Sequence, residues 1–268
     1  LRAPNSYSML AAWFGVIKAG GVAVSTMPLL RSVELQTIIN KARVSIAFCD
    51  SRLMEELEKV KSGSCLKHLV SFRDGELDER KKGKPVDFEN LATFKEDPCL
   101  IAFTSGTTGK PKAAVHSHQD MLTMCRAYSR HCLQPSSEDR FIGSPPLAFT
   151  FGLGGIGLFP LEIRASTILV EQPAPDKLLE AASRHKATVM VTSPTAYRFM
   201  LGNMADKIPD TLGKCVSAGE TLPRPTFVEW KEKTGIEILD GIGSTEMLHI
   251  FISSRKDAIK PGSTGLPV

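Results

Sequence analysis

Apolar residues recur every three to four positions in several segments of the chain and cluster in short runs between them. In residues 6–18, for example, Met9, Trp13 and Ile17 would share one face of a helix, because an α-helix has about 3.6 residues per turn. Segments with the helical period cover residues 6–18, 31–41, 51–61, 118–132, 176–185, 194–201 and 223–234. The short apolar runs predict strands at residues 22–26, 44–49, 68–72, 99–103, 140–143, 166–170, 188–191, 214–217, 237–239 and 248–252.

These helical and strand segments alternate along most of the chain. Strands separated by helices of about 10–15 residues are typical of parallel sheets. The order therefore predicts an α/β fold with mainly parallel sheets flanked by helices. Residues 73–97 interrupt the alternation with the mixed-charge stretch DGELDERKKGKP, which is typical of a surface loop. We place a boundary near residue 95, between α/β subdomains that cover residues 1–95 and 96–268.

Composition excludes some classes of binding partner but adds little about the fold. Lys and Arg (33) outnumber Asp and Glu (29) too slightly to predict nucleic-acid binding, although a net charge of +4 suits anionic small molecules. No apolar run reaches the roughly 20 residues that a membrane-spanning helix needs. The six cysteines are irregularly spaced and contain no CxxC pair, so we expect reduced, buried thiols in a cytoplasmic protein.

The most informative segment is FTSGTTGKPK at residues 103–112, which follows an apolar run. Its glycines let backbone N–H groups approach an anion, its hydroxyls can donate to phosphate oxygens, and its lysines add positive charge. A Walker A loop has four residues between its glycines and a Ser or Thr after its Lys. Here two residues separate Gly106 from Gly109, and Pro111 follows Lys110. The pattern thus predicts a phosphate-binding loop and disfavours a P-loop kinase or NTPase.

This segment resembles the signature of the adenylate-forming superfamily, which contains acyl-CoA synthetases, luciferases and the adenylation domains of nonribosomal peptide synthesis. The superfamily signature is TSGTTGxPKG after an aromatic residue or Leu, and the chain departs from it only at Ala113. VSAGE at 216–220, DGIGSTE at 240–246 and GSTGLP at 262–267 resemble three later motifs in the same order. PPLAFTFG from residue 145 and GSTEMLH from residue 243 look most like the benzoate– and 2-aminobenzoate–CoA ligases.

The resemblance implies a reaction and its cofactors. The whole protein would be an AMP-forming acid–thiol ligase that uses ATP, Mg²⁺ and coenzyme A. A carboxylate attacks the α-phosphorus of ATP to give an acyl-adenylate and pyrophosphate, and coenzyme A then displaces AMP. The chain itself would be an incomplete large N-terminal domain without the C-terminal lid domain, and we expect such a fragment to bind ligand without completing the reaction.

The resemblance also implies roles for individual residues. Thr245 would bond the α-phosphate, Glu246 would help to hold Mg²⁺, and Lys110 would contact the triphosphate. The other residues expected to hold the β- and γ-phosphates are Thr104, Ser105, Gly106, Thr107, Thr108, Gly109 and Lys112. The residues expected around the adenine are Ala218, Gly219, Glu220, Asp240, Gly241, Ile242 and Gly243.

The same motifs indicate an aryl acid as substrate. Amino-acid-activating relatives usually have an Asp near position 149, and residues 145–155 contain no acidic residue. Phe149, Phe151 and Gly152 suggest a flat, apolar slot for an acid such as benzoate or 2-aminobenzoate. His249 would be either a satisfied core residue or a hydrogen-bond partner of the substrate carboxylate.

Two departures from the superfamily and three alternatives remain at this point. Phe149 stands where many relatives have a gating His, and Ile242 stands where an aromatic residue usually stacks on adenine. The alternatives are a fatty-acyl-CoA synthetase, a non-catalytic nucleotide-binding module and, for the assembly, a homodimer.

Overall fold

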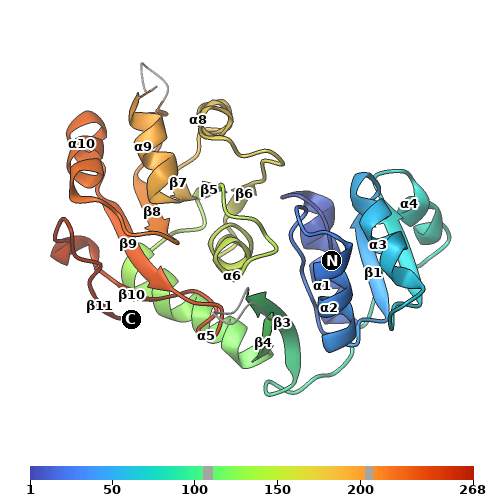
Figure 1. Ribbon diagram of the computed structural model, residues 1–268. Coiled ribbons are helices and arrows are strands. Elements are labelled where there is room, and N and C mark those ends of the chain that lie inside the picture. Colours follow the sequence, from blue (N-terminus) through green and yellow to red (C-terminus); the bar gives the residue numbers. More distant parts are fainter. Residues whose placement is uncertain (105–110, 203–207) are drawn as a thin grey trace. The chain divides into compact units, whose positions relative to one another are not determined.

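The computed structural model describes residues 1–104, 111–202 and 208–268 (Figure 1). The chain forms two compact units, Leu1–Gln119 and Asp120–Val268. The boundary near residue 95 stays a prediction for the subdomains of the family's large domain. The first compact unit extends further because backbone hydrogen bonds join Ala23 to the strand that contains Cys99 and Ile101.

The first unit begins with four helices and a pair of parallel strands. The helices are α1 (Tyr7–Lys18), α2 (Ser32–Lys41), α3 (Met54–Lys61) and α4 (Glu76–Lys81), and the strands are β1 (Ile46–Asp50) and β2 (His68–Phe72). Leu35 and Ile39 of α2 pack with Leu57 and Val60 of α3 around Cys49 of β1. The apolar residues that recur with the helical period in the sequence therefore pack against this sheet. The surface loop expected at 73–97 contains the short α4.

The strand expected at residues 22–26 does not form, although its backbone is paired. Only isolated bridges occur there, from Ala23 to Leu100 and from Thr26 to Arg2. Arg2 is buried, and its guanidinium donates to the carbonyl oxygens of Met27, Pro28 and Leu30. These bonds hold the chain in a turn instead of a continued strand.

An antiparallel hairpin completes the first unit. Strands β3 (Pro98–Thr104) and β4 (Lys112–Ser117) pair with Thr104 opposite Lys112, so the glycine-rich segment connects their ends. The sequence predicted β3 but not β4. Because a strand and not a helix follows the segment, the arrangement is not a Walker A loop.

The second unit is built on a seven-stranded sheet, counted over the described residues, with the order β11-β10-β9-β8-β7-β5-β6. The five strands β6, β5, β7, β8 and β9 are parallel to one another. Strand β10 pairs antiparallel with β9, and β11 pairs antiparallel with β10. The strands are β5 (Arg140–Gly143), β6 (Ser166–Ile168), β7 (Val189–Thr192), β8 (Lys214–Ala218), β9 (Ile238–Gly243), β10 (Ile250–Ser253) and β11 (Leu266–Pro267). The prediction of a mainly parallel sheet is confirmed.

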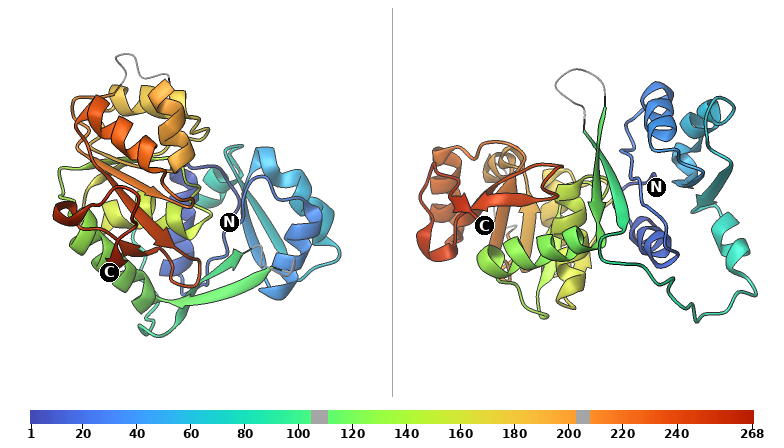
Figure 2. Two further views of the ribbon diagram at one scale, coloured as in Figure 1. Left: turned by 60° about the vertical axis from the view of Figure 1, so that its left-hand side comes forward. Right: turned by 90° about the horizontal axis from the view of Figure 1, so that it is seen from below.

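Helices cover both faces of this sheet (Figures 1 and 2). On one face α8 (Pro175–Arg184), α9 (Pro194–Gly202) and α10 (Arg224–Thr234) pack through Leu178, Tyr197 and Trp230 onto Met190 and Cys215. The other helices here are α5 (His118–Tyr128), α6 (Thr150–Gly152) and α7 (Phe159–Glu162), and the short helical segments are η2 (Ser129–Leu133), η3 (Leu153–Leu158) and η4 (Lys256–Ala258). A further short segment, η1 (Ser51–Leu53), belongs to the first unit.

The continuous helical stretch from α6 through η3 to α7 was not predicted from the sequence. Its glycines interrupt the apolar period, and residues 152–160 are buried on every side, so no polar face marks it as a helix. This stretch supplies one wall of the site described below.

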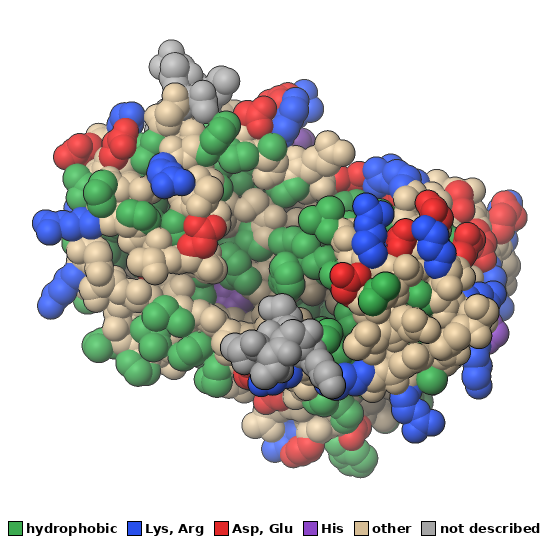
Figure 3. All heavy atoms as spheres, in the orientation of Figure 1, with side chains coloured by type: hydrophobic (Ala, Val, Ile, Leu, Met, Phe, Trp, Pro, Cys, Tyr) green, Lys and Arg blue, Asp and Glu red, His purple; other side chains and the backbone are tan. Residues whose placement is uncertain are grey.

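Acidic and basic side chains are interspersed over the face of the molecule that Figure 3 shows. Cys65 is exposed, contrary to the expectation that all six thiols are buried. No helix in the described ranges is long and apolar enough to cross a membrane.

Candidate active site

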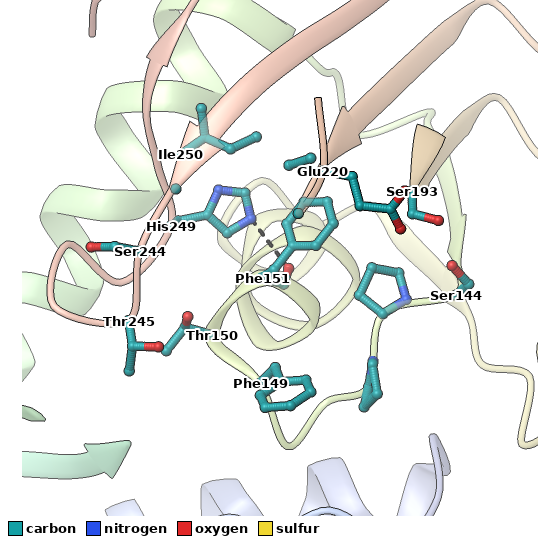
Figure 4. A pocket seen from close by; sticks show the side chains of 15 residues that line it. Ser144, Phe149, Thr150, Phe151, Ser193, Glu220, Ser244, Thr245, His249 and Ile250 are labelled. Atoms are coloured by element: carbon teal, nitrogen blue, oxygen red, sulfur yellow. Dashed lines mark hydrogen bonds between the residues drawn. The ribbon is translucent and has the colours of Figure 1, made fainter. Parts of the chain in front are cut away.

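A cavity of about 420 Å³ opens at the carboxyl ends of the central strands of the second unit (Figure 4). Ser144 directly follows β5, Ser193 directly follows β7, and Ala218 and Gly243 end β8 and β9. Parallel strands bring these ends to one edge of the sheet, which is where ligands of open α/β sheets bind. The lining residues are Ser144, Pro145, Pro146, Phe149, Thr150, Phe151, Ser193, Ala218, Gly219, Glu220, Gly243, Ser244, Thr245, His249 and Ile250.

The substrate wall predicted from the sequence lies in this cavity. Phe149 and Phe151 both line it from the start of α6. Gly152 does not line the cavity but shapes the wall, because a Cβ atom at this position would collide with the backbone of Pro145 and Pro146. The segment therefore turns from the proline pair into the helix only with glycine there.

His249 forms the inner end of the same wall. Its ring lies 4.6 Å from the ring of Phe159 and 5.4 Å from that of Phe151, measured between centroids, and it is 2% exposed. Gly154 makes room for it, since a Cβ atom there would lie 2.5 Å from Cδ2 of His249. Burial lowers the pKa of His249 to about 3. The imidazole is therefore neutral at physiological pH.

The segments expected around adenine divide between two places. Ala218, Gly219 and Glu220 line the main cavity, where the Glu220 carboxylate accepts a hydrogen bond from Oγ1 of Thr195 at 2.5 Å. Gly219 has a φ of +90°, a conformation that glycine adopts without strain. Of residues 240–243, only Gly243 lines this cavity. Gly241 and the exposed Ile242 lie beside it on β9.

Asp240 faces a separate, small cavity of about 20 Å³ beside Thr264. Its Oδ2 accepts a hydrogen bond from Oγ1 of Thr264 at 3.3 Å, whereas its buried Oδ1 has no partner among the described residues. Burial raises the pKa of this carboxyl. This cavity is about the size of one water molecule, so the expected place of Asp240 beside the adenine stays a prediction.

Thr245 and Glu246 occupy the turn between β9 and β10. Thr245 lines the cavity, and Glu246 is exposed next to it. Within the described ranges, no three or more His, Cys, Asp or Glu side chains gather as a metal site would require.

The phosphate-loop residues Ser105, Gly106, Thr107, Thr108, Gly109 and Lys110 lie outside the described residues. Their neighbours Thr104 and Lys112 end and begin the two strands of the hairpin. Their roles stay predictions.

Sequence reasoning missed Ser144, Thr150 and Ser193 as cavity residues. A signal was present, because Ser144 and Ser193 directly follow apolar runs that predict buried parallel strands. Residues in that position reach the edge of the sheet where ligands bind.

Comparison with known proteins identifies the family. The model of the AMP-binding enzyme family matches residues 1–268. The chain belongs to this family. Its relatives include a benzoate–CoA ligase of Thauera aromatica, which is 33% identical in an alignment of 271 positions that covers 96% of this chain and 50% of the relative. An anthranilate–CoA ligase of Pseudomonas aeruginosa is 35% identical in an alignment of 188 positions that covers 69% of this chain and 36% of that protein.

A solved structure of this family has the same fold. The anthranilate CoA ligase AuaEII in complex with anthranoyl-AMP has a TM-score of 0.93 and 33% identity, over 99% of this chain and 52% of that one. The chain thus spans about half the length of the AMP-binding enzymes that it matches. The predicted family and fold class are confirmed.

Proposed function

We propose that the protein is an ATP-dependent acid–CoA ligase that activates an aryl carboxylate, such as benzoate or 2-aminobenzoate, through an acyl-adenylate. The observation that carries the proposal is the composition of one cavity. It joins the aromatic wall of Phe149 and Phe151 to the segment 218–220 and to Thr245. An apolar slot for a ring and motifs for a nucleotide thus meet in one space. The benzoate– and anthranilate–CoA ligases among the relatives support this substrate class.

The first half-reaction joins two anions. A carboxylate oxygen forms a bond to the α-phosphorus, the bond from that phosphorus to the bridging oxygen breaks, and pyrophosphate leaves with the electron pair. Thr245 would donate to the α-phosphate, and the loop 104–112 would bind the β- and γ-phosphates. Bound Mg²⁺ would neutralise part of the phosphate charge, and Glu246 offers an exposed carboxylate to hold it.

Adenine would lie between the segment after β8 and strand β9. Ala218, Gly219 and Glu220 would lie along the base, and Ile242 would cover its face. Asp240 lies on the strand that carries Ile242 and faces the neighbouring small cavity, from which it would approach the base.

His249 would contact the substrate as a neutral wall and not as a cation. Its Nε2 lies within hydrogen-bond distance of the Phe151 carbonyl, and its Nδ1 is buried. In the second half-reaction the thiol of coenzyme A gives up its proton to solvent and its sulfur forms a bond to the acyl carbon. The bond from that carbon to the phosphate oxygen breaks, and AMP leaves with the electron pair. We place the enzyme in the cytoplasm, where thiols such as the exposed Cys65 stay reduced.

An ATP–pyrophosphate exchange assay on the full-length protein tests the proposal. We expect exchange that depends on benzoate or 2-aminobenzoate. Coumarate and medium-chain fatty acids serve as comparison acids. Exchange only with fatty acids would make the protein a fatty-acyl-CoA synthetase, and nucleotide binding without exchange for any acid would indicate a non-catalytic module.

A further inference from the structure

We propose that Thr195 is a positioning residue for the nucleotide, because it holds Glu220 and the segment 218–220 in one conformation before ATP binds. This inference rests on the ATP-dependent function proposed above and deepens it, but it does not depend on which acid the enzyme activates. It starts from the hydrogen bond between the side chains of Thr195 and Glu220.

The segment that follows β8 has few restraints of its own. Ala218 is the last residue of β8, and Leu222 is buried in the core of the second unit. Between them, residues 219–221 are exposed. Within the described ranges, residues 219–222 form no backbone hydrogen bond. Glycine at position 219 adds conformational freedom, so the backbone alone does not fix the segment along which the adenine would lie.

One side-chain hydrogen bond restrains this segment. Oγ1 of Thr195 donates to Oε2 of Glu220 at 2.5 Å. Hydrogen bonds to a carboxylate are about twice as strong as those between neutral groups. In the part of the chain that the structure describes, no other hydrogen bond joins residues 219–222 to another element. Glu220 also lines the cavity, so the bond fixes a residue of the site itself.

Thr195 is itself held firmly in the second unit. It lies in the first turn of α9, where Oγ of Ser193 caps the helix by accepting a backbone N–H. The hydroxyl of the fully buried Tyr197 lies 3.1 Å from the carbonyl oxygen of Val216 in β8. Helix α9 is therefore anchored to the strand from which the segment emerges. Figure 4 shows Glu220 beside Ser193, the residue that precedes this helix.

A segment that is fixed before the ligand arrives binds it more tightly. Ordering a loop during binding costs conformational entropy, and this cost is subtracted from the affinity. The bond to Thr195 removes part of that cost for the nucleotide. The rate of adenylation depends instead on groups at the α-phosphorus, such as Thr245 in the proposed mechanism. We therefore expect Thr195 to affect nucleotide affinity and not kcat.

The test measures the Kd for AMP by calorimetry, and KM for ATP and kcat by pyrophosphate exchange, in the full-length protein. Thr195→Val keeps the shape of the side chain but removes its donor. We expect Kd and KM to rise about three- to tenfold, the size of one hydrogen bond, with kcat unchanged. Thr195→Ser should retain the wild-type values. Thr221→Val is the matched control, because this exposed threonine of the same segment has no hydrogen-bond partner among the described residues.

A double-mutant cycle shows whether Thr195 acts through Glu220. Glu220→Ala should raise Kd by the same factor as Thr195→Val, and the double variant should be no worse than either single variant. Losses that add would mean that each residue acts alone, and the positioning role would be wrong. An unchanged Kd in Thr195→Val, or a fall in kcat alone, would also overturn it. If Thr195→Val does not fold, Glu220→Gln, which keeps an acceptor oxygen, should bind AMP more tightly than Glu220→Ala, and equal affinities would overturn the role.

The AMP measurement separates this inference from the aryl-acid function. If the variants weaken AMP binding but no aryl acid supports exchange, the role of Thr195 stands and the substrate class is wrong. If the wild-type protein binds neither AMP nor ATP, both proposals are wrong.

Discussion

The Nε2 atom of His249 lies 3.2 Å from the carbonyl oxygen of Phe151. A carbonyl oxygen can only accept, so Nε2 carries the hydrogen and Nδ1 is left as a bare acceptor, buried and without a partner among the described residues. The bond ties the end of the turn after β9 to the start of α6. It also leaves His249 with no ring N–H to offer a carboxylate, which disfavours the second of the two roles considered for it.

The depressed pKa of His249 predicts a pH-dependent stability. Its pKa falls from the usual 6.5 to about 3 in the folded protein because of burial. Between these values the unfolded chain binds a proton that the folded chain does not, so stability decreases as the pH falls below about 6.5. We expect a loss of about 2 kcal/mol between pH 6.5 and 5 from this group. Urea unfolding of wild type and His249→Gln at both pH values measures it. An identical pH dependence in the two proteins would show that the imidazole is solvated.

The space behind His249 predicts that Gly154 tolerates no side chain. A Cβ atom in Gly154→Ala would press on Cδ2 of His249, and we expect a loss of about 1–3 kcal/mol of stability. Gly15→Ala in α1 is the matched control, because a Cβ atom there meets nothing within 4 Å and alanine favours a helix. The free energy of unfolding of Gly15→Ala should rise by about 0.5–1 kcal/mol. Thermal unfolding of both variants gives the comparison, and an equal response would show that His249 can move aside.

Glu246 should act in adenylation and not in thioester formation. Glu246→Gln removes the charge that would hold Mg²⁺ on the triphosphate, and we expect pyrophosphate exchange in the full-length protein to fall about 100- to 1000-fold. Formation of the thioester from supplied acyl-adenylate should fall far less. Glu232→Gln, an exposed carboxylate on α10, is the control. Equal losses in both half-reactions, or unfolding of the variant, would make Glu246 structural.

Asp240 should select ATP over inosine triphosphate, which lacks the exocyclic amine. If Oδ1 accepts a bond from that amine, wild type should prefer ATP about tenfold in exchange assays, and Asp240→Ala should lose the preference. Because burial raises the pKa of this carboxyl, its charge destabilises the fold at neutral pH. Asp240→Asn should therefore unfold at a higher temperature. A preference that survives in Asp240→Ala would place the adenine elsewhere.

The sequence predicted the parts of the fold that carry a strong local period. The helices from residues 32, 175 and 194 and the buried strands β7 and β8 appear within a residue or two of their expected ends. The stretch 150–162 was missed because burial on all sides removes the amphipathic pattern, and the strand at 22–26 failed because long-range bonds to Arg2 and Leu100 shaped it instead.

The sequence likewise predicted the site residues that belong to motifs and missed those that do not. Motifs predicted a role for Thr245 and residues 218–220, and these residues line the cavity. Ser144 and Thr192 have no motif, and their pairing depends on strands that are distant in sequence but adjacent in the sheet. The sequence left two roles open for His249, because the choice between them depends on its burial, which a single sequence does not show.

The turn between β9 and β10 carries residues expected for the nucleotide and residues expected for the acid. Residues 240–246 would serve the nucleotide, and the cavity residues His249 and Ile250, which would line the acyl side, follow within four residues. Gly243 packs against the His249 backbone so closely that a Cβ atom there would lie 2.8 Å from its carbonyl oxygen. Changing the acid pocket from this hairpin would therefore shift the nucleotide contacts with it. Directed evolution toward new acids should start from the opposite wall, at residues 144–151, because the motifs assign no nucleotide contact to that segment.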